Sequence, residues 1–191
     1  MNKNLLRQKL LNVRRSLSSQ EIEKNSDKVR EILFSLSLFK EIEMILFYIS
    51  LTNEVQTYRM IEDALIGGKR VVVPVVDSIR KRIIPFEIRN PRCRLVPGFL
   101  GILEPQESER YSISLQEIEM VIVPGVAFDL KGGRLGFGKG FYDRFLNKLS
   151  SQVKFVALAF ECQIVEEIPC EKHDIAVNYV ITEKRSICCQ K

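Results

Sequence analysis

The chain has 191 residues, of which 46% are hydrophobic and 28% charged, and its 29 Lys and Arg against 24 Asp and Glu give a formal net charge of +5. This composition is typical of a globular protein, and the length is enough to bury one core without metals or disulfides. A single histidine, His173, excludes a His-rich zinc site. The five cysteines form an odd set without a C-x-x-C pair, which argues against a disulfide framework and a zinc ribbon. We therefore expect one domain over residues 1–191, in a reducing compartment.

The first 15 residues lack the apolar core of an export signal, because charges interrupt their leucines. The longest uncharged apolar stretches, 44–51 and 71–76, are far shorter than the ~20 residues that span a bilayer. These observations predict a cytoplasmic protein that does not enter membranes.

Hydrophobic periodicity and turn residues predict an alternation of strands and helices. Two helices are expected within residues 1–40, and a capping box at Ser18 and Glu21 opens the second. The first βαβ unit is expected as a strand at 44–49, a helix at 55–66 capped by Thr52-Asn53, and a strand at 71–76, followed by strand and irregular loop over 82–88 and 95–105. The second is expected as a strand at 120–123, a helix at about 141–149 and a strand at 153–160, followed by an edge strand at 177–182 and a flexible tail at 186–191. Strand, helix and strand in succession, with strands apolar on both faces, indicate right-handed βαβ units. The pattern occurs twice, and no linker separates the two units. It predicts a single Rossmann-like, three-layer α/β domain with a mostly parallel sheet.

Two segments carry the excess positive charge. Residues 69–94 hold eight Lys and Arg against two acidic residues, and residues 131–148 hold five against Asp143 alone. Residues 104–119 are instead acidic, with five Glu and one Arg. This distribution suits an anionic small molecule at least as well as a phosphate backbone. A nucleic-acid-binding module is the alternative, and it predicts steep salt dependence of binding.

The segment 124–144, PGVAFDLKGGRLGFGKGFYDR, carries the most informative pattern. Its six glycines lie between a predicted strand and a predicted helix, and such a loop is a common phosphate site. A P-loop interpretation fails because Gly140 stands where a Ser or Thr would meet magnesium. A dinucleotide fingerprint fails because Phe141 stands at its third glycine. The loop therefore belongs to neither standard class of phosphate site.

Charged residues lie among these glycines. Arg134 and Lys139 are within the loop, and Asp143 lies just inside the expected helix. Two cations and a carboxylate so close together suit a nucleoside triphosphate with Mg²⁺. The alternative is a glycine-rich hairpin with solvated charges, which would not need so many glycines beside two cations.

These residues resemble the 5-formyltetrahydrofolate cyclo-ligase family, also called 5,10-methenyltetrahydrofolate synthetases. The matching stretches are Pro124–Asp129, Arg134–Asp143, Lys3-x-x-x-Arg7, Ser50–Val55, Ala157–Phe160 and His173-Asp174. They cover nearly the whole chain in the family's order. The resemblance implies an α/β fold related to sugar-phosphate isomerases and CoA transferases, in agreement with the two βαβ units.

The resemblance also implies a role for each matching residue. The implied ATP-binding residues are Lys3, Arg7, Arg134, Leu135, Gly136, Phe137, Gly138, Lys139, Gly140, Phe141 and Tyr142, with Arg134 and Lys139 as the catalytic cations. The implied folate-binding residues are Ile49 and Glu54, and the implied magnesium ligands are Asp143 and Asp174. Two positions depart from the family's pattern. Phe141 stands where Tyr is common, and Asn178 stands where an Asp commonly follows the His-Asp pair.

The implied reaction is the ATP- and Mg²⁺-dependent conversion of 5-formyltetrahydrofolate to 5,10-methenyltetrahydrofolate. In it the γ-phosphoryl group moves to the formyl oxygen, N10 attacks, and phosphate leaves. Phosphoryl transfer needs alignment and charge stabilisation rather than a covalent nucleophile, which agrees with the scarcity of His. The expected partners are therefore ATP and the folate, with the chain as a monomer that binds neither nucleic acid nor membranes.

Several other interpretations stay open at this point. Arg89, Arg92 and Arg94 form a solvated face or attract the glutamate tail of a polyglutamylated folate. An acyl-CoA transferase of the same fold would use a carboxylate nucleophile, with Glu54 and Glu161 as candidates, and a sugar-phosphate isomerase is a further alternative. His173 beside Asp174 is more often a structural pair than a catalytic dyad.

Overall fold

The computed structural model describes residues 2–171 and 173–189. Its α-helices are α1 (Lys3–Arg15), α2 (Ser19–Ser35), α3 (Ser37–Glu41), α4 (Tyr58–Ile66) and α5 (Phe141–Leu146), and its 3-10 helices are η1 (Phe99–Gly101), η2 (Glu107–Glu109), η3 (Leu115–Glu117) and η4 (Glu161–Gln163). The strands of the main sheet are β1 (Met44–Leu46), β2 (Arg70–Asp77), β3 (Arg82–Ile88), β6 (Tyr111–Ser112), β7 (Met120–Val123), β10 (Lys154–Leu158), β12 (Tyr179–Ile181) and β13 (Ser186–Cys188). Two smaller sheets contain β4 (Leu95–Pro97) with β5 (Leu103–Pro105), and β8 (Ala127–Asp129) with β9 (Arg134–Leu135) and β11 (Ile164–Val165). Among these described residues, no helix is long and apolar enough to cross a membrane.

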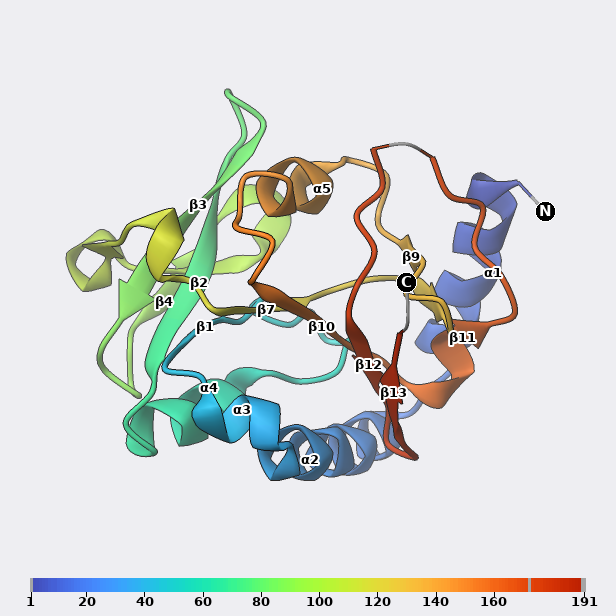
Figure 1. Cartoon of the computed structure of the whole chain (residues 1–191), viewed down its shortest axis with the longest axis horizontal. Helices are drawn as coiled ribbons and strands as arrows, with labels where there is room; N and C mark the ends of the chain where they lie inside the picture. The colour runs from blue at the N-terminus through green and yellow to red at the C-terminus, as the bar shows by residue number, and fades with distance from the viewer. Residues whose placement is uncertain (1, 172, 190–191) are drawn as a thin grey trace.

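The main sheet has the strand order β13-β12-β10-β7-β1-β2-β3-β6 (Figure 1). Its five central strands, β12, β10, β7, β1 and β2, are parallel. β3, β6 and β13 pair antiparallel at the two sides. From β1 the chain continues to β2 on one side, whereas from β7 it continues to β10 on the other. The neighbours β1 and β7 therefore form the topological switch point, and the predicted α/β class is confirmed.

Helices cover both faces of this sheet, because its strands are apolar on both sides. Ile45 and Val71 pack with residues of α2, α3 and α4 in one core. Met44 and Val72, one residue away on the same strands, pack with Phe145 of α5 in a second core. Figure 1 shows the first group of helices below the sheet and α5 above it. The three layers follow from the period of two residues along a strand.

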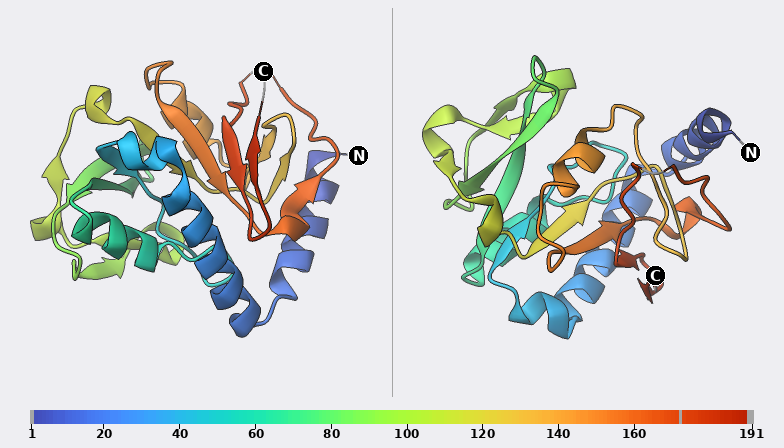
Figure 2. Two further views of the ribbon diagram at one scale, coloured as in Figure 1. Left: turned by 60° about the horizontal axis from the view of Figure 1, so that its bottom comes forward. Right: turned by 45° about the horizontal axis from the view of Figure 1, so that its top comes forward.

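Helix α1 does not cover the main sheet. Its Leu6 and Leu10 pack on Val126, Leu135 and Ile168, which belong to or adjoin the small sheet β11-β8-β9. Both views in Figure 2 show α1 beside this small sheet. The position of α1 matters for the site, because its polar residues then lie next to the glycine-rich segment that follows β9.

The C-terminal part of the chain differs from the sequence-based expectation. The strand expected at the edge, 177–182, forms β12, but β12 lies inside the sheet because β13 pairs with it. Residues 186–191 were expected as a flexible tail, yet Ser186–Cys188 forms β13, and 190–191 lie outside the described residues. The short apolar pattern of β13 is too weak to predict a strand without its partner.

Two further elements differ in detail. The helix expected at 55–66 begins only at Tyr58, because side chains in the preceding loop bond to backbone groups. The Thr57 hydroxyl donates to the Tyr48 carbonyl at 2.7 Å, and the Gln56 amide donates to the Leu51 carbonyl at 2.8 Å. The irregular stretch expected over 95–105 contains the antiparallel pair β4–β5. The capping box at Ser18 and Glu21, in contrast, is present as predicted.

Candidate active site

The candidate site lies at the carboxyl ends of β1 and β7. In open α/β sheets ligands bind at this edge, in the crevice where the strand order reverses. The segment after β1 supplies Glu54, and the segment after β7 begins with Pro124 and Gly125. The crevice therefore brings together two of the stretches that the sequence singled out.

Glu54 is a buried carboxylate in this crevice, 5% exposed. Its Oε2 accepts a hydrogen bond from the Leu51 amide at 3.0 Å. Its Oε1 is buried and accepts no hydrogen bond within the part of the chain that the structure describes. Burial raises the pKa of Glu54, while the Arg14 guanidinium and the Leu51 N–H oppose that rise. One face of the carboxylate is thus fixed, and the other is available to a donor from a ligand.

Arg14 of α1 is the cation beside this carboxylate. Its side chain is only 1% exposed, and its Nη1 lies 3.6 Å from Glu54 Oε1. The same guanidinium donates to the Gly125 carbonyl and to Asn53 Oδ1, each at 3.2 Å. It also lies 5.5 Å from the centroid of the Phe137 ring. Arg14 thereby contacts the segments that follow β1, β7 and β9.

Two tyrosines with buried hydroxyl groups, Tyr48 and Tyr142, complete this polar cluster. The Tyr48 hydroxyl donates to the Val55 carbonyl at 2.9 Å. The Tyr142 hydroxyl is buried and has no hydrogen-bond partner among the described residues. Burial raises the pKa of both phenols, and the nearby Glu54 carboxylate adds to the effect. Both hydroxyls therefore stay protonated, and that of Tyr142 can donate to a ligand.

The first half of the glycine-rich segment is structural. β8 and β9 form an antiparallel hairpin, in which a Cβ on Gly132 would lie 2.4 Å from the Val177 carbonyl oxygen. A Cβ on Gly133 would lie 2.4 Å from Asp129 Oδ2. Asp129 is 2% exposed and accepts backbone hydrogen bonds from Lys131, Gly133 and Ile168 at 2.8–2.9 Å. These two glycines therefore allow the hairpin to pack closely, Gly132 against Val177 and Gly133 against Asp129.

The second half, 136–140, is surrounded by guanidinium groups. A Cβ on Gly138 would lie 3.5 Å from Arg7 Cζ, and one on Gly140 would lie 2.8 Å from an Arg144 nitrogen. The Arg7 side chain donates to the Gly136 carbonyl at 2.8 Å. The Arg144 side chain donates to the Lys139 carbonyl at 3.1 Å and to the Lys81 carbonyl at 2.9 Å. This loop offers a concentration of positive charge that suits phosphate groups.

Arg134 and Lys139, the two expected catalytic cations, differ in their surroundings. Arg134 is buried, and its Nη2 lies 2.5 Å from Asp143 Oδ1. Lys139 is exposed, and its ammonium group has no ion-pair partner among the described residues. The alternative of a hairpin with solvated charges is thus half correct, because a hairpin exists but its arginine is buried. Lys139 is the exposed cation of the two.

Asp143 and Asp174, the expected magnesium ligands, lie in adjoining segments. The Ile175 amide is 3.4 Å from Asp143 Oδ1. Asp174 Oδ2 accepts hydrogen bonds from Lys3 Nζ and from the Glu171 amide, both at 2.7 Å, and these contacts lower the pKa of Asp174 against the effect of burial. No group of three or more His, Cys, Asp and Glu side chains with metal-binding geometry occurs in residues 2–171 and 173–189. These two carboxylates therefore do not form an all-protein metal cage.

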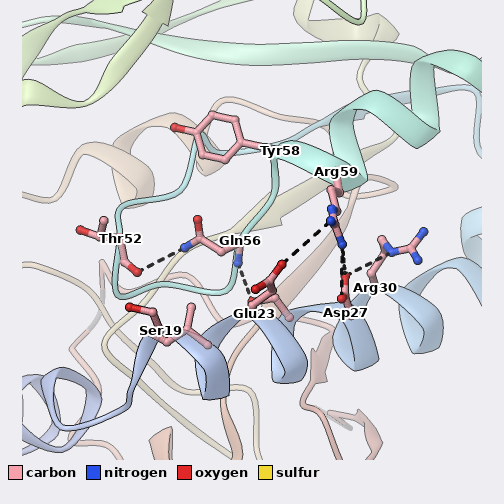
Figure 3. A pocket seen from close by; sticks show the side chains of 10 residues that line it. Ser19, Glu23, Asp27, Arg30, Thr52, Gln56, Tyr58 and Arg59 are labelled. Atoms are coloured by element: carbon pink, nitrogen blue, oxygen red, sulfur yellow. Dashed lines mark hydrogen bonds and ion pairs between the residues drawn. The ribbon is translucent and has the colours of Figure 1, made fainter.

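A separate groove of about 350 Å³ lies between α2 and the loop that carries Glu54 (Figure 3). Figure 3 shows Arg59 pointing across the groove towards Glu23 and Asp27, with Nη atoms 3.9 and 3.3 Å from their carboxylates. Arg30 adds an ion pair with Asp27 at 4.0 Å. The charges in this groove neutralise one another, so the groove lacks the excess of positive charge found around residues 136–140.

The family model for 5-formyltetrahydrofolate cyclo-ligases matches residues 1–183. The chain belongs to the 5-formyltetrahydrofolate cyclo-ligase family. It is 37% identical over 139 residues to the 5-formyltetrahydrofolate cyclo-ligase of Escherichia coli K12, covering 72% of this chain and 76% of that protein. It is 30% identical over 188 residues to the same enzyme of Mycolicibacterium smegmatis, covering 97% of this chain and 95% of that one. The NMR structure of Aquifex aeolicus 5,10-methenyltetrahydrofolate synthetase matches the fold with a TM-score of 0.86, at 36% identity over 100% of this chain and 94% of that one.

In this cyclo-ligase family member the structure brings most of the expected site residues together. Lys3 and Arg7 of α1 lie against Asp174 and Gly136, which are distant in sequence. Ile49 is buried at the carboxyl end of β1, five residues before Glu54. The family resemblance predicts that these segments form one site, and the packing of α1 brings Lys3 and Arg7 into contact with two of them.

Other candidates lie elsewhere or are already engaged. Glu161, a possible nucleophile, accepts hydrogen bonds from Thr182 and Arg185, each at 2.6 Å. Arg89 directly follows β3 and stacks on Tyr111. Because β3 is antiparallel to β2, Arg89 lies level with the start of β2, at the amino ends of the parallel strands, whereas Glu54 lies at their carboxyl ends. Glu161 is therefore already engaged by hydrogen bonds, and Arg89 lies away from the crevice.

Two residues of the site were not singled out from the sequence. Arg14 and Arg144 are ordinary helical cations by their spacing, and no motif marks them. Arg14 donates to Gly125 and Arg144 donates to Lys81, each more than 60 residues away along the chain. A pattern of neighbouring residues therefore cannot predict these contacts.

Proposed function

We propose that this family member converts 5-formyltetrahydrofolate to 5,10-methenyltetrahydrofolate while ATP becomes ADP and phosphate. The observation that carries the proposal is a juxtaposition at the β1–β7 crevice. A buried carboxylate with one unpartnered oxygen, Glu54, lies beside a glycine loop that is surrounded by arginines. The first suits the N–H groups of a pterin, and the second suits a triphosphate.

Glu54 is the proposed folate-binding residue. A buried acceptor without a partner costs roughly 1–3 kcal/mol, more for a charged group, and a ligand N–H that reaches Glu54 Oε1 removes that cost. The buried Tyr142 hydroxyl near it supplies a donor for a ligand oxygen or nitrogen. Ile49 provides apolar surface at the base of the same crevice.

The ATP-binding residues of the proposal are Lys3, Arg7 and the loop from Arg134 to Tyr142. Lys139 and Arg134 hold β- and γ-phosphate oxygens and stabilise the charge that develops during phosphoryl transfer. Lys139 is exposed and forms no ion pair within the described residues, so its ammonium group is available to a phosphate, whereas Arg134 is paired with Asp143. Backbone N–H groups of the loop add neutral donors.

The chemistry requires a leaving group on an amide-like carbon. The formyl oxygen attacks the γ-phosphorus, the bond from that phosphorus to the β,γ-bridging oxygen breaks, and ADP leaves. N10 then attacks the activated formyl carbon, its proton is lost, and the C–O bond breaks to release phosphate. The chain supplies alignment and charge in both steps, and no protein nucleophile is needed.

Magnesium commonly enters such sites with the nucleotide, bound by one or two carboxylates together with the phosphates. Asp143 and Asp174 fit this role, because Asp143 Oδ2 and Asp174 Oδ1 accept no hydrogen bond within the described part of the chain. Bound there, the ion would offset the negative charge of the triphosphate. Lys3 holds Asp174 in place for it.

The test follows methenyl-tetrahydrofolate by absorbance and released phosphate in the same reaction, for the wild-type chain and two variants. We expect Lys139→Ala to raise the KM for ATP, and Glu54→Gln to raise the KM for the folate, each by roughly 10- to 100-fold, as expected for a hydrogen bond to a charged group. Lys148→Ala and Glu62→Gln change exposed residues of the same types and serve as controls. No product from the wild-type chain would refute the proposed function. Equal effects of both variants on both substrates would refute the division of roles.

A further inference from the structure

We propose that Arg14 is a positioning residue, which holds the Glu54 carboxylate for the folate and ties it to the glycine loop across the β1–β7 crevice. The inference rests on the proposed function and extends it to a residue outside the matched motifs. Arg14 comes from α1, a helix that packs on the small sheet rather than on the main one.

The contacts of Arg14 join three segments that approach the crevice from different directions. Its guanidinium donates to the Gly125 carbonyl after β7 and to Asn53 Oδ1 after β1. It lies under the Phe137 ring, which is 45% exposed at the tip of the glycine loop. Movement of any of the three segments therefore moves the cation that faces Glu54.

The fit between Arg14 and Glu54 is incomplete in a way that suits a ligand. The closest approach, 3.6 Å from Nη1 to Oε1, is longer than a hydrogen bond. Arg14 Nε and Glu54 Oε1 are both buried without a partner among residues 2–171 and 173–189. Two apolar side chains of similar volume would join α1 to the crevice without this cost. A role in packing alone does not explain a buried ion pair that leaves polar atoms unpaired.

The charge of Arg14 decides the state of Glu54. The groups that face this carboxylate are Arg14 from α1, the Leu51 N–H and Tyr48 from the segment after β1, and Tyr142 from α5. Within the described part of the chain, Arg14 is the one cation among them, since the two phenols stay neutral. Without it, burial would raise the pKa of Glu54 further, and the carboxylate would be protonated over a wider range of pH. A protonated Glu54 binds the pterin N–H groups less well.

The experiment compares Arg14→Met, Arg14→Lys, Glu54→Gln and the double variant Arg14→Met/Glu54→Gln, with Arg15→Met as the matched control on the exposed side of the same helix. We measure kcat/KM for 5-formyltetrahydrofolate between pH 5.5 and 8.5, the KM for ATP, and folate binding by calorimetry. The double variant removes both buried charges and so remains informative if Arg14→Met alone does not fold. Arg14→Lys retains the charge.

Arg14→Met is expected to lower kcat/KM for the folate roughly 10- to 100-fold at pH 7 and to shift the acid limb of its pH profile to higher pH. Arg14→Lys is expected to restore the acid limb, and the double variant to be no worse than Glu54→Gln. The role of Arg14 would be overturned, with the proposed function left intact, by any of three results. These are losses of kcat/KM that multiply in the double variant, an acid limb that does not move in Arg14→Met, or an equal loss of kcat/KM in Arg15→Met. A wild-type chain that neither binds nor converts the folate would overturn the proposed function as well.

Discussion

Asp129 gives the sharpest prediction about the stability of the site. Its carboxylate accepts three backbone hydrogen bonds, from Lys131, Gly133 and Ile168, and thereby joins the β8–β9 hairpin to the segment after β11. Asp129→Asn keeps the shape of the side chain but removes the charge. The new amide nitrogen cannot accept, so the Ile168 bond to Oδ2 is lost, at ~1.5–3 kcal/mol for a hydrogen bond to a charged group. The two bonds to Oδ1 become bonds to a neutral group and weaken by ~1 kcal/mol each, which makes the whole loss about 4 kcal/mol.

Urea unfolding followed by circular dichroism measures this loss of unfolding free energy directly. In a thermal scan we expect the melting temperature to fall by roughly 8–16 °C for a chain of this size. Asp27→Asn is the control, because Asp27 pairs with an exposed arginine of α4 and should change stability by less than about 1 kcal/mol. A loss below about 1 kcal/mol in Asp129→Asn would show that these three bonds do not hold the hairpin in place.

Three more predictions follow from particular side chains. Gly125→Ala should cost about 1–3 kcal/mol in urea unfolding, because the new Cβ would lie 2.4 Å from Phe128 Cζ; an unchanged midpoint would show that the ring moves freely. Asp143→Asn should raise the Mg²⁺ concentration needed for half-maximal activity at fixed ATP, whereas an unchanged titration would remove Asp143 from the metal site. Burial raises the pKa of the Cys189 thiol to about 11, so it should react more slowly with a thiol reagent at pH 8 than the exposed Cys188, with a rate that rises towards pH 11. A faster reaction at Cys189, compared through single Cys→Ser variants, would contradict its burial.

The βαβ units could be predicted from the sequence because their signal is local. Buried parallel strands such as β2 and β7 are uninterrupted apolar runs, and their order along the chain fixes the parallel pairing. The site segments also carried local signals, namely the glycines and the stretch around Glu54. The family resemblance, now confirmed by the match over residues 1–183, assigned roles that periodicity could not.

The remaining features depend on contacts between distant segments. The sequence pattern suggests one phosphate loop with six glycines. In the structure Gly125 precedes β8, Gly132 and Gly133 belong to a hairpin, and the other three lie in a loop among arginines. Arg14 has the spacing of a solvated helical residue, and it is buried because the packing of α1 brings it against Gly125, Asn53 and Phe137. Strand β13 is short and becomes a strand only because β12 is there to pair with it.

The central claim is that ATP activates the formyl oxygen at this crevice. The most direct measurement uses 5-formyltetrahydrofolate labelled with ¹⁸O in the formyl group, in a reaction with Mg²⁺ and ATP, followed by mass spectrometry of the released phosphate. We predict one labelled phosphate for each methenyl-tetrahydrofolate formed. Label that appears in water while the phosphate stays unlabelled, or methenyl-tetrahydrofolate formed without ATP, would contradict the account.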